Sequence, residues 1–155
     1  MRILAVTVVI LWMATAVDSA FAQQSTWRLV VPSKGQTVYV NRSAIVDLEP
    51  GIVQFWTLTD SDQPYLQDGN IVASTVTLQV ANCKARSIGP LQLIAYSGRC
   101  GSGEPVIIQN IAEYPNAQMI APPPNTNGFI LLNLMCFGPA RMALIDSQPP
   151  SLCSQ

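Results

Sequence analysis

The chain has 155 residues, of which 49% are hydrophobic and 11% charged, and its 8 Lys and Arg residues nearly balance its 9 Asp and Glu residues. This balance leaves no basic surface of the size that nucleic-acid binding needs, because such binding depends on neutralising a run of phosphates. The sequence contains no histidine, so a Ser-His-Asp triad, a Cys-His pair and a histidine-ligated zinc are all excluded within one chain. Composition therefore argues against nucleic acid as a partner and predicts a protein that is not an enzyme.

The N-terminus has the pattern of a secretory signal peptide. Arg2 precedes an apolar run over residues 3–17, and Ala20-Phe21-Ala22 supplies small residues where a signal peptidase cuts. The apolar run is shorter than the roughly 20 residues that a membrane span needs. We predict residues 1–22 as a signal peptide, with no membrane span after its removal. Because Gln23 rather than cysteine follows the cut, no lipid anchor is expected, and the mature protein should lie in the periplasm, on the cell surface or in the medium.

Four cysteines, all in the part of the chain expected to be exported, predict two structural disulfides. They are Cys83, Cys100, Cys136 and Cys153. Export places them in oxidising conditions, and an even number favours complete pairing. The closest two are 17 residues apart, so the Cys-x-x-Cys spacing of zinc sites and redox motifs is absent. No metal or cofactor is predicted, and all three pairings remain open at this point.

Six short runs rich in β-branched and aromatic residues predict strands, most of them joined by turns of hairpin length. The runs are Trp27–Val31, Thr37–Val40, Ile52–Thr59, Thr75–Val80, Leu91–Tyr96 and Val106–Ile111. The alternation of polar and apolar residues is clearest in the fourth run, which predicts a central strand with one buried face. The short connections favour an antiparallel meander.

Two segments between these strands are predicted to be irregular. Asn41 can cap a single helical turn that ends near Ile45. The polar stretch from Asp60 to Asn70 is predicted as an exposed loop, and its acids lack the spacing of a calcium loop. Tyr65 lies within this stretch. Because exposed tyrosines are enriched at binding hot spots, it is our candidate protein-binding residue.

Cys83 follows the predicted central strand, and its position poses a question of geometry. Unbroken alternation would place it on the face opposite Val76, Leu78 and Val80. Either a bulge intervenes, or the disulfide reaches across that second face. The sequence leaves both alternatives open.

A nearly continuous apolar run from Phe129 to Met135 predicts a short helix. Asn125, Thr126 or Asn127 can cap its start, and Gly138-Pro139 would stop it. A buried strand is the alternative, because periodicity does not separate the two in so short a run. Leucine and methionine outnumber β-branched residues, which favours a helix packed on the sheet.

The remaining residues, 140–155, are predicted as a C-terminal tail tethered by a disulfide through Cys153. Together these elements predict an α+β fold, mainly β. It consists of a sheet of about six antiparallel strands, one short C-terminal helix packed on it, and two disulfides.

The sequence contains no recognisable catalytic spacing. The glycine-rich stretch Gly98–Gly103 lacks the Gly-Lys-Ser/Thr ending of a phosphate-binding loop and is predicted as a turn. A hydrolase using carboxylates would need two acids facing a cleft, chosen from Asp47, Glu49, Asp60, Asp62, Asp68, Glu104, Glu113 and Asp146. No spacing pairs any two of them, so we interpret them as solvated surface acids.

Several short motifs, taken in order, resemble the surface-adhesin protein E family of Gram-negative bacteria. The resemblance runs from Trp27 to about Phe137. After Trp27 the motifs are Val38-Tyr39-Val40-Asn41 with Ile45, Val53-Gln54-Phe55-Trp56, Cys83-Lys84-Ala85-Arg86, Tyr96 with a glycine turn, and Ile120-Ala121-Pro122 ahead of the run to Cys136. The chain departs from the family pattern at Asn41, where Asp is expected, and lacks an aromatic just before Ile120. Cys100 and Cys153 look like an added pair.

The resemblance implies an antiparallel sheet with a small C-terminal helix, a domain over residues 23–139, and a disulfide between Cys83 and Cys136. It also implies a capacity to form a homodimer and adhesion to host matrix proteins such as vitronectin and laminin. We therefore expect an exported, non-enzymatic binding domain of the surface-adhesin type, with a protein as its partner. The alternative is a periplasmic envelope-assembly or structural accessory protein whose partner is another bacterial protein.

Overall fold

The computed structural model describes residues 26–151 and residue 153, so the predicted signal peptide lies outside the described residues. The described chain forms one antiparallel sheet of seven strands in the order β1-β2-β4-β5-β6-β7, with β3 paired to β4. The strands are β1 (Trp27–Ser33), β2 (Gln36–Asn41), β3 (Val46–Glu49), β4 (Ile52–Gln67), β5 (Asn70–Asn82), β6 (Ser87–Tyr96) and β7 (Pro105–Asn110). All six predicted strands are present, and the antiparallel arrangement is confirmed.

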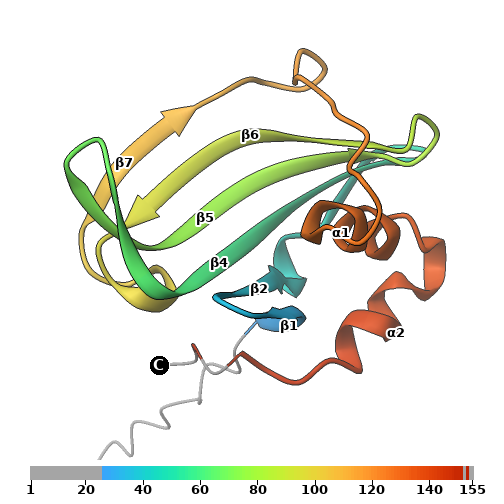
Figure 1. Ribbon diagram of the computed structural model, residues 1–155. Helices are drawn as coiled ribbons and strands as arrows, with labels where there is room; N and C mark the ends of the chain where they lie inside the picture. Colours follow the sequence, from blue (N-terminus) through green and yellow to red (C-terminus); the bar gives the residue numbers. More distant parts are fainter. Residues whose placement is uncertain (1–25, 152, 154–155) are drawn as a thin grey trace, which may run out of the picture.

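Two helices cover one face of this sheet. Figure 1 shows β4, β5 and β6 as long, curved neighbours, with β7 beyond β6 and the pair β1 and β2 beyond β4. The helices α1 (Asn127–Met135) and α2 (Arg141–Asp146) pack on the sheet around a core of Val31, Val38, Val40, Val53, Phe55, Ala81, Ile88, Leu131, Leu132, Met135 and Ile145. Each of these side chains larger than alanine contributes roughly 1.5–3 kcal/mol on burial, so this is the main core. We call this side the helix-covered face and the opposite side the open face.

The prediction of a loop from Asp60 to Asn70 is wrong, although residues 62–66 are exposed as expected. Both strands continue through it as a hairpin that turns at Asp68 and Gly69, whose φ angles are 50° and 80°. Two successive positive φ angles suit the twist of a hairpin, and Asp-Gly is a strong signal for such a turn. The register jumps between the pair Asp60–Ser74 and the pair Tyr65–Val72, so β4 carries extra residues there. This irregularity accounts for the loop-like composition, and Figure 1 shows that the end of the hairpin bends upward.

The helical turn predicted after β2 is confirmed as a 3-10 turn, η1 (Arg42–Ala44), and the Asn41 side chain accepts a hydrogen bond from the Ser43 N–H. The strand that follows, β3, has no counterpart in the sequence analysis. Its four residues are all exposed, and it pairs with the first residues of β4. A short strand without a buried face has no alternation of polar and apolar residues, so it leaves no periodic signal.

The predicted C-terminal helix is confirmed as α1. Thr126 caps it, because its hydroxyl oxygen accepts a hydrogen bond from the Phe129 N–H at 3.3 Å. Gly138 has a φ angle of 65° and stands just beyond the helix, as expected for a stop. The segment predicted as a simple tail is partly helical: after the 3-10 turn η3 (Gly138–Ala140), α2 buries Ile145 in the main core. Six residues are too few to show helical periodicity in a sequence.

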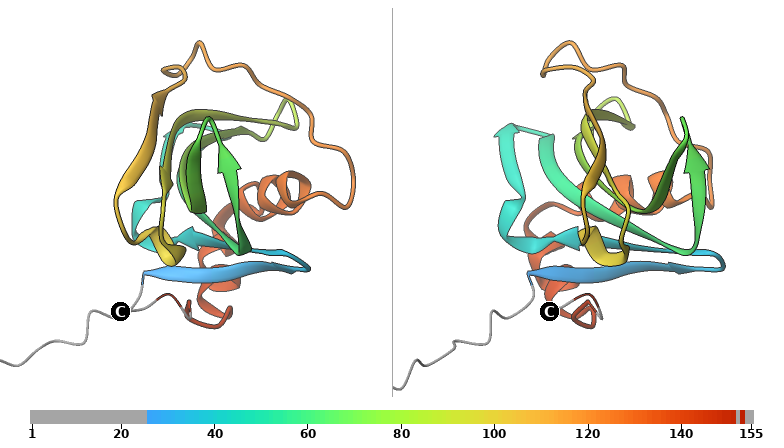
Figure 2. Two further views of the ribbon diagram at one scale, coloured as in Figure 1. Left: turned by 60° about the vertical axis from the view of Figure 1, so that its left-hand side comes forward. Right: turned by 90° about the vertical axis from the view of Figure 1, so that its left-hand side faces the viewer.

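The chain then returns to the outer edge of β1. The Leu29 N–H donates to the Pro149 carbonyl and the Ser151 N–H to the Trp27 carbonyl, both at 3.1 Å, and Arg28 forms an isolated bridge with Pro150. Figure 2 shows this last segment beside β1. It covers a strand edge that would otherwise offer unpaired backbone groups.

The two disulfides join Cys83 to Cys136 and Cys100 to Cys153, with Cα–Cα distances of 5.3 and 5.1 Å. The first is the pairing that the family resemblance implies, and the second is the added pair that tethers the C-terminus. Along β5 the pairing with β4 is regular from Ser74 to Asn82, and Cys83 packs against the main core. The second alternative for Cys83 is therefore correct. The disulfide lies on the face opposite Val76, Leu78 and Val80, which is the helix-covered face.

Within residues 26–151 and 153, no single helix has both the length and the apolar character to cross a membrane. Taken together, α1 and the segment Gly138–Asp146 meet both criteria, but they bend by 108° at the break between them.

Candidate functional site: a groove on the open face

The open face presents the side chains that alternate with the core residues. One row crosses four strands, because Trp56 in β4 pairs with Leu78 in β5, Leu78 with Gln92 in β6, and Gln92 with Asn110 in β7. Residues directly opposite each other in antiparallel strands point to the same side, so these four side chains form one surface. Both described α-helices, α1 and α2, pack on the opposite, helix-covered face.

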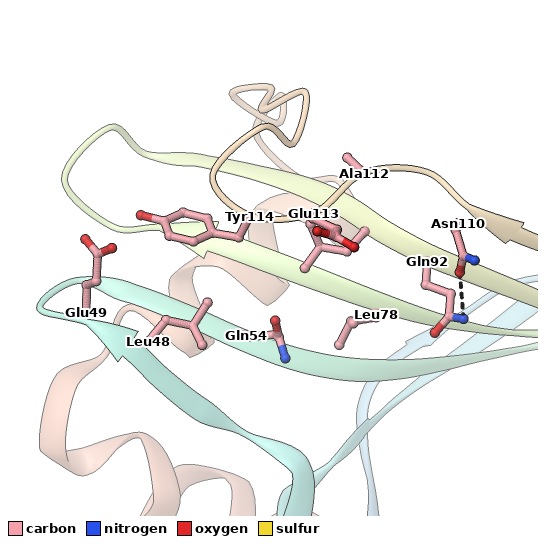
Figure 3. A pocket seen from close by; sticks show the side chains of 10 residues that line it. Leu48, Glu49, Gln54, Leu78, Gln92, Asn110, Ala112, Glu113 and Tyr114 are labelled. Atoms are coloured by element: carbon pink, nitrogen blue, oxygen red, sulfur yellow. Dashed lines mark hydrogen bonds between the residues drawn. The ribbon is translucent and has the colours of Figure 1, made fainter.

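At one end of the open face the side chains enclose a groove of about 640 Å³, lined by Leu48, Glu49, Gln54, Leu78, Leu91, Gln92, Asn110, Ala112, Glu113 and Tyr114. Figure 3 shows these side chains in front of the sheet and the helices behind it. One wall comes from the end of β3, and the other from the segment that follows β7. The volume lies within the range of pockets that hold ligands.

A β-bulge shapes the floor of the groove. Leu78 pairs with Gln92 but the next residue, Gln79, pairs with Pro90, so Leu91 is an extra residue in β6. Leu91 is 5% exposed and packs in a second, smaller core with Ile52 and Val80. Because of the bulge, Leu91 and Gln92 both line the groove, which gives it an apolar floor beside a polar side chain.

The polar groups on the floor are amides. The Gln92 side-chain nitrogen donates to the Asn110 side-chain oxygen at 3.0 Å, and Figure 3 shows this bond at one end of the groove. Gln54 projects from β4 near the middle. Amides both donate and accept hydrogen bonds, so this floor can pair with the backbone or side chains of a partner.

The charged groups in the lining are carboxylates. Glu49 lies on one wall and Glu113 on the other, and both are exposed. The Tyr114 side chain extends toward Glu49 across the groove (Figure 3). Partial burial raises the pKa of Tyr114 above its usual value, and the negative charge of Glu49 raises that pKa further. Among the described residues, neither glutamate forms an ion pair within 4.0 Å.

The wall after β7 is fixed to the sheet by backbone hydrogen bonds. The N–H groups of Ile111 and Ala112 both donate to the Leu91 carbonyl, at 2.8 and 3.1 Å, and Ile120 exchanges two bonds with Ile88. Gly89 lies under this segment, and a Cβ atom there would stand 2.6 Å from the Gln118 carbonyl oxygen. Glycine is needed at this position because the backbone passes so close, and the wall therefore keeps a defined place over the sheet.

The residue selected from the sequence as a protein contact, Tyr65, lies far from the groove lining, in the β4–β5 hairpin. It is 44% exposed, and two neighbours at the hairpin end, Leu66 and Ile71, are 75% and 57% exposed. Leu66 and Ile71 pair directly across the hairpin. The structure thus places Tyr65 beside an exposed apolar pair. We call these three residues, Tyr65, Leu66 and Ile71, the hairpin tip.

A group of three residues in the described part of the chain brings together side chains that could hold a metal: Asp60, Cys100 and Cys153. Both sulfurs belong to a disulfide, and the Asp60 oxygens accept hydrogen bonds from the Arg99 side chain and the Cys100 N–H. Metal binding by cysteine requires a thiolate. These residues therefore connect separate segments of the chain through hydrogen bonds and a disulfide, and they do not fit a metal site.

Sequence reasoning did not single out the groove. Glu49 and Glu113 were considered only as members of a set of surface acids, and the amides and Tyr114 carried no signal. The lining comes from five strands, β3 to β7, and from the segment after β7, which are far apart in the chain. The one local cue, the Leu91 bulge, depends on pairing with β5 and has no signature in the sequence of β6 alone.

The family model for surface-adhesin protein E matches residues 27–137. Crystal form II of Haemophilus influenzae protein E has a similar fold, with a TM-score of 0.54 and 19% identity over 72% of this chain and 87% of that one. A second structure of the same protein gives a TM-score of 0.52 at 19% identity over 72% and 84%, and one from a non-typeable strain gives 0.51 at 19% over 72% and 76%. The comparison with curated proteins gave no significant match. Because the family model covers well over half of the sequence, this chain belongs to the surface-adhesin protein E family.

Proposed function

We propose that this protein is an exported, non-enzymatic binding domain of the surface-adhesin type, and that its partner is another protein. The observation that carries the proposal is the asymmetry of the sheet. Its helix-covered face is filled by the main core, whereas the open face carries a groove with apolar, amide and carboxylate side chains. This mixture is typical of surfaces that recognise proteins, where apolar contact area is combined with a few polar groups that fix orientation.

Two surfaces are proposed to take part in binding. The groove is the first, and the hairpin tip around Tyr65 is the second. Exposed Leu66 and Ile71 beside a half-exposed tyrosine form a small exposed apolar patch, the kind of surface that marks interaction sites. Host matrix proteins such as vitronectin and laminin are the partners that we propose to test first, because membership of the family favours a surface role.

The two carboxylates in the groove also allow a hydrolase to be considered. A glycosidase needs one carboxyl group that stays protonated near neutral pH, and enzymes achieve this by burying it in apolar surroundings. Glu49 and Glu113 are both exposed. Their solvated positions favour a role in binding a partner over proton transfer.

Cell fractionation distinguishes a surface adhesin from a periplasmic accessory protein. The full chain is expressed in a Gram-negative host with a C-terminal tag, and membranes, periplasm, medium and intact-cell surface are probed separately. We expect exposure on intact cells or release into the medium, with a processed N-terminus at Gln23. Retention in the periplasm would support the accessory role and contradict adhesion.

A binding screen tests the partner class. The exported protein is passed over immobilised vitronectin, laminin and purified envelope proteins, and the double variant Leu66→Ser/Ile71→Ser is compared with Lys34→Ser, which changes an exposed residue of another hairpin. We expect at least one protein to be retained, with weaker retention of the hairpin-tip variant only. Retention of none of these proteins would contradict the proposed function.

A further inference from the structure

We propose that the groove on the open face binds an arginine side chain of the protein partner, together with the residues on either side of that arginine. This inference rests on the proposed function, because it assumes a protein partner. It goes beyond that function in naming the side chain that the groove recognises. Charge, shape and hydrogen-bonding capacity all support it.

The carboxylates in the groove favour a cationic ligand. Glu49 and Glu113 face the groove from opposite walls, and no lysine or arginine is among the lining residues. The ion pairs of the described residues use Arg42, Arg99 and Arg141 with aspartates elsewhere. The two glutamates therefore keep their charge available, and a cationic side chain entering between the walls would be attracted by both.

The shape of the groove suits a long side chain with a charged end. Leu48, Leu78 and Leu91 provide apolar contacts for methylene groups, while the carboxylates stand on the walls above. Arginine and lysine commonly bury their stems along apolar surface in this way and keep the charged head near polar groups. The volume of about 640 Å³ exceeds one side chain, so neighbouring residues of the partner must also enter.

The hydrogen-bonding groups favour arginine over lysine. A guanidinium is flat and has several N–H donors, so it can bond to a carboxylate and an amide oxygen at once, whereas an ammonium is a compact point charge. The groove offers such acceptors in Glu49, Glu113 and the side chain of Gln54. The Tyr114 ring adds an aromatic surface at the wall, against which a guanidinium stacks favourably.

The test is an NMR titration of the exported, isotope-labelled protein with short synthetic peptides. The probe is an acetylated and amidated pentapeptide with a central arginine between alanines, compared with the same peptide carrying citrulline or lysine. Citrulline keeps the shape of arginine but removes its charge. We expect shift changes confined to residues 48–49, 54, 78, 91–92 and 110–114, with binding of the arginine peptide at least about tenfold tighter than that of the citrulline peptide.

Two variants locate the effect. Glu113→Gln and Glu49→Gln should each weaken the arginine peptide about fivefold, the effect expected for losing one partly exposed ion pair. Glu104→Gln removes the same charge from an exposed position before β7, at the end away from the groove, and should leave binding unchanged. Unaltered amide spectra away from the substitution show that each variant is folded.

Several results would overturn the inference. Equal binding of the citrulline peptide would remove the role of charge, and equal binding of the lysine peptide would remove the preference for arginine. Shifts of the groove amides that depend on protein concentration would place a second copy of the chain in the groove. If a partner protein from the screen binds the Glu49→Gln/Glu113→Gln variant as tightly as the native protein, the adhesin function stands and the groove assignment fails.

Discussion

At the scale of single residues, Asp60 is the most deeply buried charged residue in the described chain. It is 1% exposed, and its oxygens accept hydrogen bonds from Arg99 Nε and Nη2 at 2.8 and 2.6 Å and from the Cys100 N–H at 2.7 Å. These bonds attach the 3-10 turn η2 (Arg99–Gly101) to β4. The same carboxylate holds the pKa of Arg99 above its usual value through hydrogen bonding and charge. A buried carboxylate needs such partners, because leaving it unpaired would be costly.

We predict that Asp60→Asn lowers the free energy of unfolding by about 1–2 kcal/mol, because an amide cannot replace a charge-assisted pair and must face Arg99 with its own donors. The estimate is modest because the Arg99 side chain is 56% exposed. Urea unfolding of the oxidised protein measures the change.

Asp62→Asn provides the matched control for Asp60→Asn. Asp62 is 53% exposed and stands 3.8 Å from the same arginine, so its substitution should change stability by less than about 0.5 kcal/mol. Equal effects of the two variants would show that burial of Asp60 contributes nothing.

At the scale of elements, segments with clear periodicity, β-rich composition or caps were predicted, whereas β3 and α2 were not. The strand β5 and the helix α1 combine length or apolar character with recognisable ends. By contrast, β3 and α2 form because partners elsewhere hold them. The Arg141 side chain at the start of α2 donates to both Asp47 oxygens of β3, at 2.9 and 2.8 Å, and to the Met135 carbonyl at 3.0 Å. Contacts between residues so far apart in the chain leave no local pattern.

A second ion pair fixes α2 to η1 and makes a prediction about pH. Asp146 accepts hydrogen bonds from Arg42, which lowers the pKa of Asp146 below its ordinary value of 3.8. A carboxyl group whose pKa is lower in the folded protein stabilises the fold above its unfolded pKa, and that stabilisation disappears as pH falls through the folded pKa. We expect this contact to hold at neutral pH and to be lost only below about pH 4.

Titration of the Asp146 carboxyl carbon by NMR checks this prediction. Arg42→Gln removes this contact and should therefore raise the pKa of Asp146 toward its ordinary value. Arg86→Gln serves as the control, because Arg86 hydrogen bonds with Asn133 rather than with an acid. An Asp146 pKa that is the same with and without Arg42 would contradict the proposed coupling.

At the scale of the whole molecule, the two disulfides hold different parts of the protein. Each joins residues 53 positions apart, so chain entropy alone predicts about 4 kcal/mol of stabilisation for either one. Cys83 and Cys136 pack against the main core. Cys100 and Cys153 instead fasten the last described segment, which covers the outer edge of β1. We expect that removing this second bridge lets the segment detach while the core stays packed.

We therefore predict that Cys83→Ala/Cys136→Ala destabilises the protein by about 4 kcal/mol or more, whereas Cys100→Ala/Cys153→Ala costs less, because freedom regained by the detached segment offsets part of the loss. Double variants avoid leaving a reactive thiol. Denaturant unfolding gives the ranking.

Hydrogen exchange at the Leu29 amide reports local detachment, since this N–H donates to the Pro149 carbonyl. It should speed up in the Cys100→Ala/Cys153→Ala variant without a matching change in the β5 amides. Equal losses of stability in both double variants, with no local change at Leu29, would contradict this division of roles.

The sequence by itself determined the class of fold and excluded several kinds of catalytic and metal chemistry. The absence of histidine excludes histidine chemistry within the chain, alternation in β5 indicates a sheet with one buried face, and the order of short motifs identifies the family. These are properties of composition and of neighbouring residues, which a sequence displays directly. Only the tertiary structure showed the groove, the course of the β4–β5 hairpin and the partners of Asp60 and Arg141. Such features arise where the register of one strand sets the position of another, and pairing between distant residues is decided by the packing of the whole sheet.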